Sequence, residues 1–433
     1  MKKVDFLLGC EVKGRELESL CLLRHELIKR GYSVEIKSFL ELSGKLITHY
    51  DAEVFASGGL RFWSNIPYEI GQAVKFRKHI EMPWEEVFQN SFYNNHVVRD
   101  QIGLETVTTV WGEKPKRYFI ENESVNSDRI FVCGHPVMDF CKPKLKNYYR
   151  NRESVAEVYN ISTKKQWNLF SSSFTTVASE ESWWIDYDKA NNIDVYHRLY
   201  LLEKETQNKI LEWFRTVLSK HKEQVIIYRP HPDEIVVDEV YAVEKEFDNF
   251  YIIRDMGIIQ WLRVCDRAYT WISTSTAEAF FVGMPNYILR PVKVPQDIEI
   301  VTFSHPEKFI EDVEGFEETF YKKPTEHSIS DKELRDFYYY DEKNYTYSIL
   351  ADLFEEVYKN EKYKISEDTI RRCDDYMKKY YRGLPFDSKI VRWIKGSFLY
   401  KYWLFFFGSN RPNNHITKKE IDLIDERIGK CLD

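Results

Sequence analysis

Gln224-Val225-Ile226-Ile227-Tyr228, followed by Arg229-Pro230-His231-Pro232-Asp233-Glu234, is the stretch from which the fold follows most directly. Its short apolar run predicts a buried strand, and its two prolines predict a rigid turn at the strand's carboxyl end. Ligands of open α/β sheets bind at that end of the strands. Because Arg229 and His231 can both donate to phosphate oxygens, we interpret the turn as a phosphate site. The alternative is a rigid turn whose histidine caps a neighbouring helix.

Strands and helices alternate on both sides of this stretch. The pattern predicts helices over 198–221, 257–264 and 276–282, and further strands over 166–171, 250–253, 267–272 and 286–289. Such alternation is typical of a parallel sheet that is covered by helices on both faces.

A run of hydroxyl side chains opens the last of these helices. Ser273, Thr274, Ser275 and Thr276 follow the preceding strand, and Glu278 stands in the first helical turn. Free backbone N–H groups at a helix N-terminus bind anions together with such hydroxyls, and the carboxylate can reach a ribose diol. A plain serine cap is the alternative, although four hydroxyl residues in a row exceed what a cap needs. We therefore expect this segment to hold the phosphate and ribose of a nucleotide.

The first 150 residues repeat the alternation. The pattern predicts a helix over 15–30 and strands over 4–8, 33–36, 51–57, 79–82, 105–110 and 129–133. A polar, basic segment at 142–152 then separates the two series. We therefore predict an α/β protein with two Rossmann-like, doubly wound domains (1–150 and 151–330), a cleft between them, and a helical C-terminal extension over 331–433.

The two C-terminal motifs resemble the donor-site signatures of GT-B glycosyltransferases. Arg-Pro-His-Pro at 229–232, and Ser-Thr-Ser-Thr-Ala-Glu-Ala with Gly-Met-Pro at 273–285, are similar to motifs of the surface carbohydrate biosynthesis proteins. Similar motifs occur in bacterial sialyltransferases, Kdo transferases and CDP-glycerol glycerophosphotransferases. Residues 9–16 and 130–139 resemble two further segments of the first family, with His135 in place of its Asn and Val137 in place of its Arg.

The resemblance implies a GT-B glycosyltransferase that moves a sugar from a nucleotide-activated donor to a surface polysaccharide or glycolipid acceptor. A CMP-linked acidic sugar is the preferred donor, and a UDP sugar is the other choice. Cations and helix dipoles, rather than a metal or another cofactor, would stabilise the leaving phosphate. A CDP-alditol polyol-phosphate transferase, a sugar-nucleotide epimerase and a non-catalytic sugar-binding subunit of a polysaccharide assembly complex are the alternatives.

Candidates for acid–base chemistry come from the first half, because the acceptor domain of this architecture supplies the base. Glu11 follows the first strand, and Glu86 comes shortly after the strand at 79–82. Either carboxylate could take the proton of an acceptor hydroxyl, although a single exposed Glu is more often a surface residue. His135 is a candidate for orienting the leaving phosphate, with packing of its own loop as the alternative.

Composition narrows the class of protein. The formal net charge of −7 argues against a nucleic-acid partner, which requires a basic surface. With no N-terminal signal and no apolar run near about 20 residues, we expect a cytoplasmic protein. The seven cysteines include no Cys-x-x-Cys pair, which favours reduced thiols. We expect no metal site, and we interpret Asp186-Tyr187-Asp188 as a surface loop rather than a metal-binding Asp-x-Asp.

The C-terminal region contains one strongly basic stretch. Residues 371–401 carry nine Lys or Arg and three Asp, a local charge of +6, and run into Tyr402-Trp403-Leu404-Phe405-Phe406-Phe407. A basic, aromatic segment can lie on an anionic bilayer surface, so peripheral membrane contact through 371–407 is one interpretation. The interpretation that we favour is a C-terminal helix whose aromatic side chains pack across the two domains.

Overall fold

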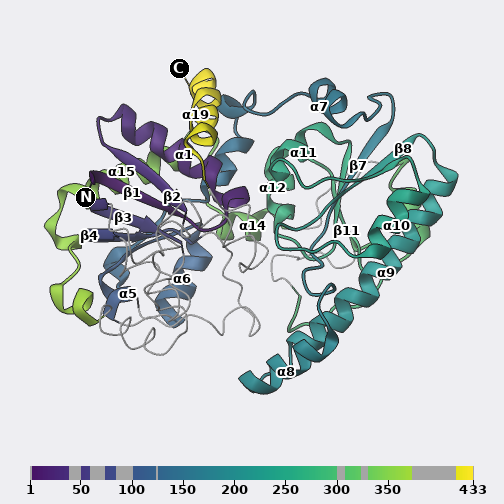
Figure 1. Ribbon diagram of the computed structural model, residues 1–433, viewed down its shortest axis with the longest axis horizontal. Coiled ribbons are helices and arrows are strands. Elements are labelled where there is room, and N and C mark those ends of the chain that lie inside the picture. The colour runs from purple at the N-terminus through teal and green to yellow at the C-terminus, as the bar shows by residue number, and fades with distance from the viewer. Residues whose placement is uncertain are drawn as a thin grey trace, which may run out of the picture. The chain divides into compact units, whose positions relative to one another are not determined.

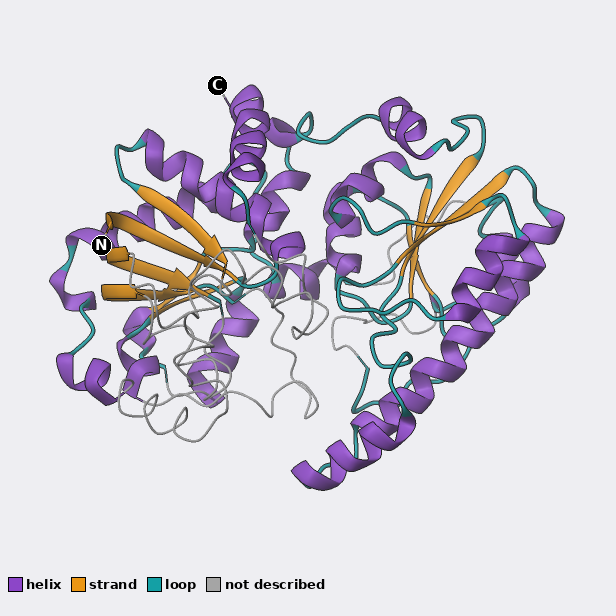
Figure 2. Cartoon of the chain, in the orientation of Figure 1, coloured by secondary structure: helices purple, strands orange, loops and turns teal. Residues whose placement is uncertain are grey.

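The computed structural model describes residues 2–38, 50–58, 74–83, 101–122, 125–299, 308–322, 330–372 and 416–432. They form two compact units, each built on its own parallel sheet (Figures 1 and 2). Unit 1 comprises residues 1–87, 95–148 and 335–433, and unit 2 comprises residues 88–94 and 149–334. The predicted α/β class with two doubly wound domains is confirmed. None of the helices that the structure describes is both long and apolar enough to cross a membrane.

Unit 1 contains a six-stranded sheet in the order β2-β1-β3-β4-β5-β6, and every neighbouring pair is parallel. Its strands are β1 (Lys2–Cys10), β2 (Val34–Ser38), β3 (Tyr50–Ser57), β4 (Val74–Glu81), β5 (Val107–Val110) and β6 (Ile130–Val132). Parallel neighbours need crossover connections, and α1 (Lys13–Lys29) supplies the first, with its leucine face buried. Helices α5 (Gln101–Glu105) and α6 (Glu113–Asn122) lie on the other side of the sheet in Figure 1.

The chain returns to unit 1 after residue 334. Helix α14 (Asp331–Phe337) spans the point of return, and α15 (Thr346–Lys359) and α19 (Lys418–Leu432) both pack against α1, beside which Figure 1 shows them. Ion pairs connect both helices to α1. Arg30, the residue after α1, pairs with Asp352 of α15 at 2.6 Å, and Lys13 pairs with Glu420 of α19 at 2.7 Å. The described helices of the C-terminal extension therefore belong to the N-terminal unit.

Unit 2 contains a five-stranded parallel sheet in the order β11-β10-β7-β8-β9. Its strands are β7 (Gln166–Ser171), β8 (Gln224–Arg229), β9 (Phe250–Ile252), β10 (Arg267–Thr270) and β11 (Asn286–Ile288). Helices α9 (Tyr196–Lys220) and α10 (Asp238–Glu246) lie on one side of it, and α11 (Ile258–Val264) and α12 (Ser275–Val282) lie on the other (Figure 2). Helices α7 (Arg152–Tyr159), α8 (Glu181–Asn191) and α13 (Val313–Glu318) also belong to the unit. The first strand of the unit thus lies in the middle of its sheet, and the strand order reverses between β7 and β10.

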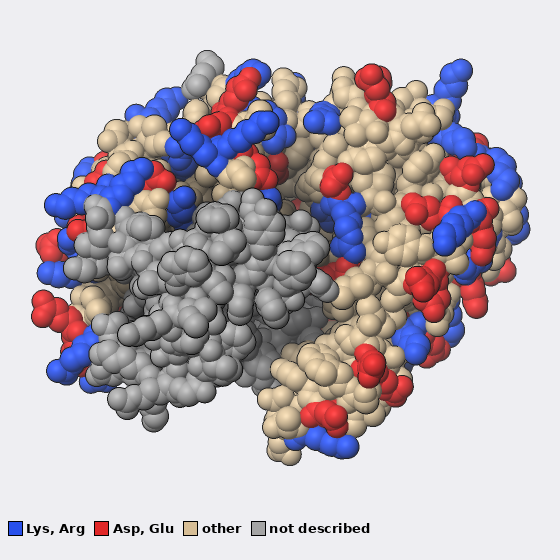
Figure 3. All heavy atoms as spheres, viewed as in Figure 1, with Lys and Arg blue, Asp and Glu red and all other residues tan. Residues whose placement is uncertain are grey.

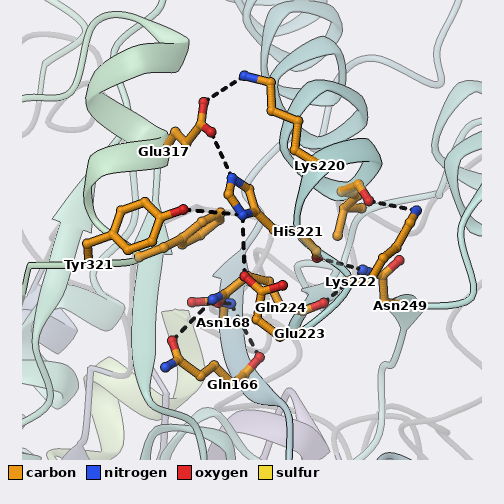
Figure 4. Close-up of polar contacts among 12 residues, drawn as sticks. Gln166, Asn168, Lys220, His221, Lys222, Glu223, Gln224, Asn249, Glu317 and Tyr321 are labelled. Atoms are coloured by element: carbon orange, nitrogen blue, oxygen red, sulfur yellow. Dashed lines mark hydrogen bonds and ion pairs between the residues drawn. The ribbon is translucent and has the colours of Figure 1, made fainter.

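Polar side chains fasten the amino edge of this sheet (Figure 4). Gln224 donates to Gln166 at 3.2 Å and accepts from Asn168 at 3.0 Å, which joins β8 to β7. At the end of α9, His221 Nε2 lies 2.7 Å from a carboxylate oxygen of Glu317, which connects that helix to α13. These side chains bond to one another and hold the helix ends on the sheet.

The prediction of a surface loop at Asp186-Tyr187-Asp188 was wrong. These residues lie in helix α8 (Glu181–Asn191). Asp188 is buried and accepts backbone N–H groups of Tyr196 at 3.2 Å and His197 at 2.9 Å, so its carboxylate supports the start of α9. Stacking of Trp184 on Tyr196, with ring centroids 5.7 Å apart, also holds the two helices together.

Candidate functional site

The strand order of unit 2 brings three loops to one edge of its sheet. β7 lies between β8 and β10, and all three strands are parallel, so their carboxyl ends meet at the same edge. Arg229 ends β8 and His231 lies in the loop after it. Ser273 and Thr274 lie between β10 and α12, and Ser275 and Thr276 open that helix. Ser172 and Ser173 follow β7, which lies between the other two strands. The reversal point of an open parallel sheet is where such folds bind their ligands.

Arg229 and Glu278 form the charged part of this edge. Burial lowers the pKa of Arg229 to about 10, and the charge of Glu278 opposes that change. Burial raises the pKa of Glu278 to about 7, and the charge of Arg229 acts against the rise. The two predicted loops therefore come close enough for their charges to interact. Within the described part of the chain, Arg229 Nε and Glu278 Oε2 are buried atoms without a hydrogen-bond partner. Such atoms are costly to leave unpaired, and a bound ligand can satisfy them.

The loop after β9 helps to hold Arg229. Nη2 of Arg229 donates to the backbone carbonyl of Met256, which lies in that loop, at 2.8 Å. Met256 has a φ of +67°, a left-handed conformation that is uncommon for a side-chain-bearing residue. Backbone strain of this kind is concentrated at functional sites, where surrounding contacts maintain it.

His231 is oriented by its own turn. Its Nδ1 accepts the backbone N–H of Asp233 at 3.2 Å, and its own backbone N–H donates to Glu234 at 3.1 Å. Because Nδ1 acts as an acceptor there, a neutral His231 carries its ring proton on Nε2. The backbone carbonyl of His231 accepts from Arg254 at 3.4 Å. Local hydrogen bonds therefore fix the turn that carries His231.

The hydroxyl run opens α12 as predicted, but its backbone N–H groups are not free. Ser275 N–H donates to Ser273 Oγ at 3.2 Å, and Thr276 N–H donates to the carbonyl of Ser273 at 3.4 Å. Thr274 occupies the N-cap position, and its side chain makes no capping bond. The hydroxyls of Ser273 and Ser275 lie 2.9 Å apart. The hydroxyl of Thr276 also donates to the carbonyl of Ser273 at 2.7 Å, so hydroxyl and backbone groups of this segment are bonded to one another.

The serines that follow β7 were not predicted as site residues. Ser173 Oγ is buried and, among the residues that the structure describes, has no hydrogen-bond partner; the same holds for Trp271 Nε1 at the exit of β10. The ring of Trp271 stacks on Phe174 with centroids 5.2 Å apart. Buried unpaired atoms also occur on Asn168 and Arg267 at the amino edge. At the carboxyl edge such atoms belong to Arg229 and Glu278, whose charges interact.

The candidates in unit 1 follow β1 and β6. Glu11 is half-buried, and its backbone N–H donates to Glu16 at 2.7 Å. Glu16 is fully buried and pairs with the guanidinium of Arg15 at 2.8 Å. The start of α1 is therefore rigidly held, and Glu11 stands at the carboxyl end of its strand. Glu86 lies outside the described residues, as do nearly all of the residues 371–407.

His135 is packed into the body of unit 1. Its ring lies 4.1 Å from that of Trp111, and its Nδ1 accepts the backbone N–H of Val137 at 3.1 Å. Burial, assisted by the charge of Arg15, lowers the pKa of His135 to about 3, so the imidazole is neutral at physiological pH. A neutral, buried ring that caps its own turn fits the packing interpretation of this histidine better than phosphate binding.

Asp139, in the same loop, fastens the returning chain. It accepts backbone N–H groups at the start of α15, from Thr346 at 2.9 Å and Tyr347 at 2.7 Å. Lys142, also buried, pairs with it at 2.7 Å. Gly134 has a φ of +86°, and an added Cβ would come within 2.7 Å of Thr346 Oγ1. The segment 133–142 therefore supports the fold by holding α15.

The described residues lack the features that metal and nucleic-acid sites require. In the described parts of the chain, no three His, Cys, Asp or Glu side chains gather in a way that could hold a metal ion. On the face shown in Figure 3, acidic and basic side chains are interspersed over the described surface rather than gathered into a basic stripe.

Comparison with known proteins identifies the fold. No protein-family model matches the sequence, and no curated protein matches it. Among solved structures, the wall teichoic acid polymerase TagF is similar with a TM-score of 0.53 and 11% identity, over 82% of this chain and 89% of that chain. A TagF variant soaked with CDPG is similar with a TM-score of 0.50 and 12% identity, again over 82% of this chain and 89% of that chain. A UDP-N-acetylglucosamine 2-epimerase is similar with a TM-score of 0.49 and 12% identity, over 83% of this chain and 98% of that chain. The chain has a GT-B-like fold.

Proposed function

We propose that this protein is a glycosyltransferase that takes a sugar from a nucleotide-activated donor and binds the donor's phosphate at the carboxyl edge of the unit 2 sheet. The observation that supports the proposal best is the pair Arg229 and Glu278, whose charges interact while each keeps a buried polar atom unpaired. A phosphate oxygen would satisfy the guanidinium, and a ribose hydroxyl would satisfy the carboxylate.

In the proposed reaction an acceptor hydroxyl attacks the anomeric carbon of the donor sugar. The bond from that carbon to the phosphate oxygen breaks, and the nucleotide leaves with additional negative charge. Arg229, His231 and the hydroxyls of 273–276 would stabilise that charge, without a metal ion. Glu11 and Glu86 remain the candidates for the base that takes the hydroxyl proton.

The preferred donor is a CMP-linked acidic sugar, on the resemblance of the two motifs to those of sialyl and Kdo transferases. The acceptor would be a glycan or glycolipid. Transfer of a polyol phosphate from a CDP-alditol is the second candidate, and the similarity of the fold to TagF favours it over the others. In that reaction a hydroxyl would attack the β-phosphorus, and CMP would leave.

A thermal-shift screen with CMP, CDP, UDP and GDP tests the proposal first, because a ligand that binds only the native state raises its melting temperature. Product analysis with CMP-sugars and CDP-glycerol, in the presence of EDTA, then separates the two reactions. Glycosyl transfer in EDTA supports the proposal. The proposal would be contradicted if no nucleotide changed the melting temperature of the protein, or if turnover required a metal.

A further inference from the structure

A carboxylate beneath the candidate phosphate site connects two of the loops that form it. Glu234 is 2% exposed and follows the turn that carries His231. One of its oxygens accepts the backbone N–H of His231 at 3.1 Å, and the other accepts the hydroxyl of Tyr228 at 2.6 Å. The carboxylate therefore joins the turn to the end of strand β8.

Tyr228 carries the connection to the loop after β7. Its hydroxyl oxygen lies 2.8 Å from Ser172 Oγ, and Gln207 of α9 donates to it at 3.2 Å. Because Tyr228 gives its one proton to Glu234, Ser172 is the donor in its bond with Tyr228. A continuous chain of buried hydrogen bonds thus runs from Ser172 through Tyr228 and Glu234 to the backbone of His231.

A second carboxylate holds the same β7 loop from α9. Glu203 accepts both the backbone N–H of Thr176 at 2.8 Å and its hydroxyl at 2.7 Å. Burial raises the pKa of Glu203 to about 8, and the nearby charge of Glu234 adds to the rise. The β7 loop is therefore held at two points, and Ser173 lies between them with a buried hydroxyl that has no partner in the described chain.

We propose that Glu234 is a positioning residue, which holds the His231 turn and, through Tyr228, the Ser172–Ser173 loop in one arrangement around the donor phosphate. The inference rests on the proposed function for the identity of the ligand. Neither Glu234 nor Tyr228 needs to touch that ligand, because both side chains are buried and act through the hydrogen bonds that join the two loops. Buried, fully bonded networks of this kind fix a single geometry.

The test uses the full chain with Glu234→Gln and Tyr228→Phe, singly and together. Glu239→Gln, an exposed glutamate on α10, is the matched control, and His231→Ala assigns the His231 signals. Two quantities are measured: the ¹⁵N spectrum of the imidazole, which reports its tautomer, and the dissociation constant of CDP.

In the wild type and the control, His231 should show an unprotonated Nδ1 and a protonated Nε2. Glu234→Gln should change that signal and weaken CDP binding by about tenfold. A tenfold loss of affinity corresponds to the loss of about one hydrogen bond to a charged group. The double variant should bind CDP no more weakly than Glu234→Gln, since both changes break the same chain.

An unchanged His231 signal in Glu234→Gln, or losses of CDP affinity that simply add, would overturn the inference. If Glu234→Gln does not fold, Tyr228→Phe decides, since it removes one oxygen atom. It should weaken CDP binding, and wild-type affinity would count against the proposal. If CDP does not bind the wild type, the imidazole spectra still test the positioning, and the screen with CMP, CDP, UDP and GDP tests the proposed function separately.

Discussion

Arg229 ends strand β8 and Glu278 lies in α12, the helix after strand β10, and yet each charge shifts the pKa of the other. Strand β7 lies between those two strands, so the interaction spans the point where the strand order of unit 2 reverses. Arg229 Nε and Glu278 Oε2 are not closed into a hydrogen bond with each other or with any other described residue. Each side chain therefore keeps a buried polar atom that a ligand could bind.

Glu278→Gln should change how stability depends on pH. Burial raises the pKa of Glu278 to about 7 from 4.5, so the folded state binds this proton more tightly than the unfolded state. That stabilisation is complete below about pH 4.5 and is lost as the pH rises through 7. Relative to the glutamine variant, the wild type should gain about 2–3 kcal/mol of unfolding free energy between pH 8 and pH 5. Urea unfolding at both pH values measures it, and parallel pH curves would refute the burial argument.

Arg229→Gln should raise the pKa of Glu278 further. The guanidinium charge favours the ionised carboxylate, so its removal leaves burial unopposed. We expect ¹³C titration of the glutamate carboxyl groups to place Glu278 above its wild-type pKa of about 7 in this variant. Arg254→Gln, which changes another arginine of unit 2, is the comparison. A pKa of Glu278 that stays the same or falls would show that the two charges do not interact.

The elements of unit 2 could be predicted well because local patterns set them. Strand β7 was predicted over 166–171 and extends over Gln166–Ser171, and α12 begins within one residue of the predicted start. Both charged loops follow strands that an apolar run marks in the sequence. Their position at one edge then follows from the parallel alternation of strands and helices.

The features that could not be predicted from the sequence depend on contacts between residues far apart in the chain. Ser173 became a site residue because β7 is the central strand, and strand order cannot be obtained from periodicity. Asp188 was misinterpreted because the partners of its carboxylate lie in the next helix. The charge state of His135 depends on burial beside Trp111, which stands 24 positions earlier in the sequence. In each of the three cases, the contact that determines the role of the residue is made with a part of the chain outside the local sequence pattern.

Gly134→Ala should destabilise unit 1. The φ of +86° is unfavourable for alanine by about 1–2 kcal/mol, and the added methyl group would also meet Thr346 Oγ1 at 2.7 Å. We expect a loss of at least that size in chemical unfolding. Gly14→Ala in α1 is the control, because its methyl group meets nothing within 4 Å and favours the helix. Equal stability of the two variants would show that α15 does not pack on Gly134.

Asp139→Asn should weaken the attachment of α15. The amide can accept at only one atom, which leaves one backbone N–H of the helix start and the charge of Lys142 without their partner. Breaking a buried pair of this kind costs about 3–5 kcal/mol. Hydrogen exchange of the α15 amides should increase together with the loss of unfolding free energy. Asp128→Asn, at an exposed position, should change neither, and full protection of α15 in Asp139→Asn would argue against the role.

The central claim is that the carboxyl edge of the unit 2 sheet binds the phosphate of a nucleotide donor. The most direct test is the thermal shift by CMP, CDP, UDP and GDP for the wild type, Arg229→Gln and His231→Ala, with His197→Ala on α9 as a histidine control. We predict that at least one nucleotide stabilises the wild type and the control, by about 2.7 kcal/mol at a concentration 100 times its Kd. Both site variants should lose most of that shift while folding normally. Full shifts in Arg229→Gln and His231→Ala, or no shift in the wild type, would contradict the claim.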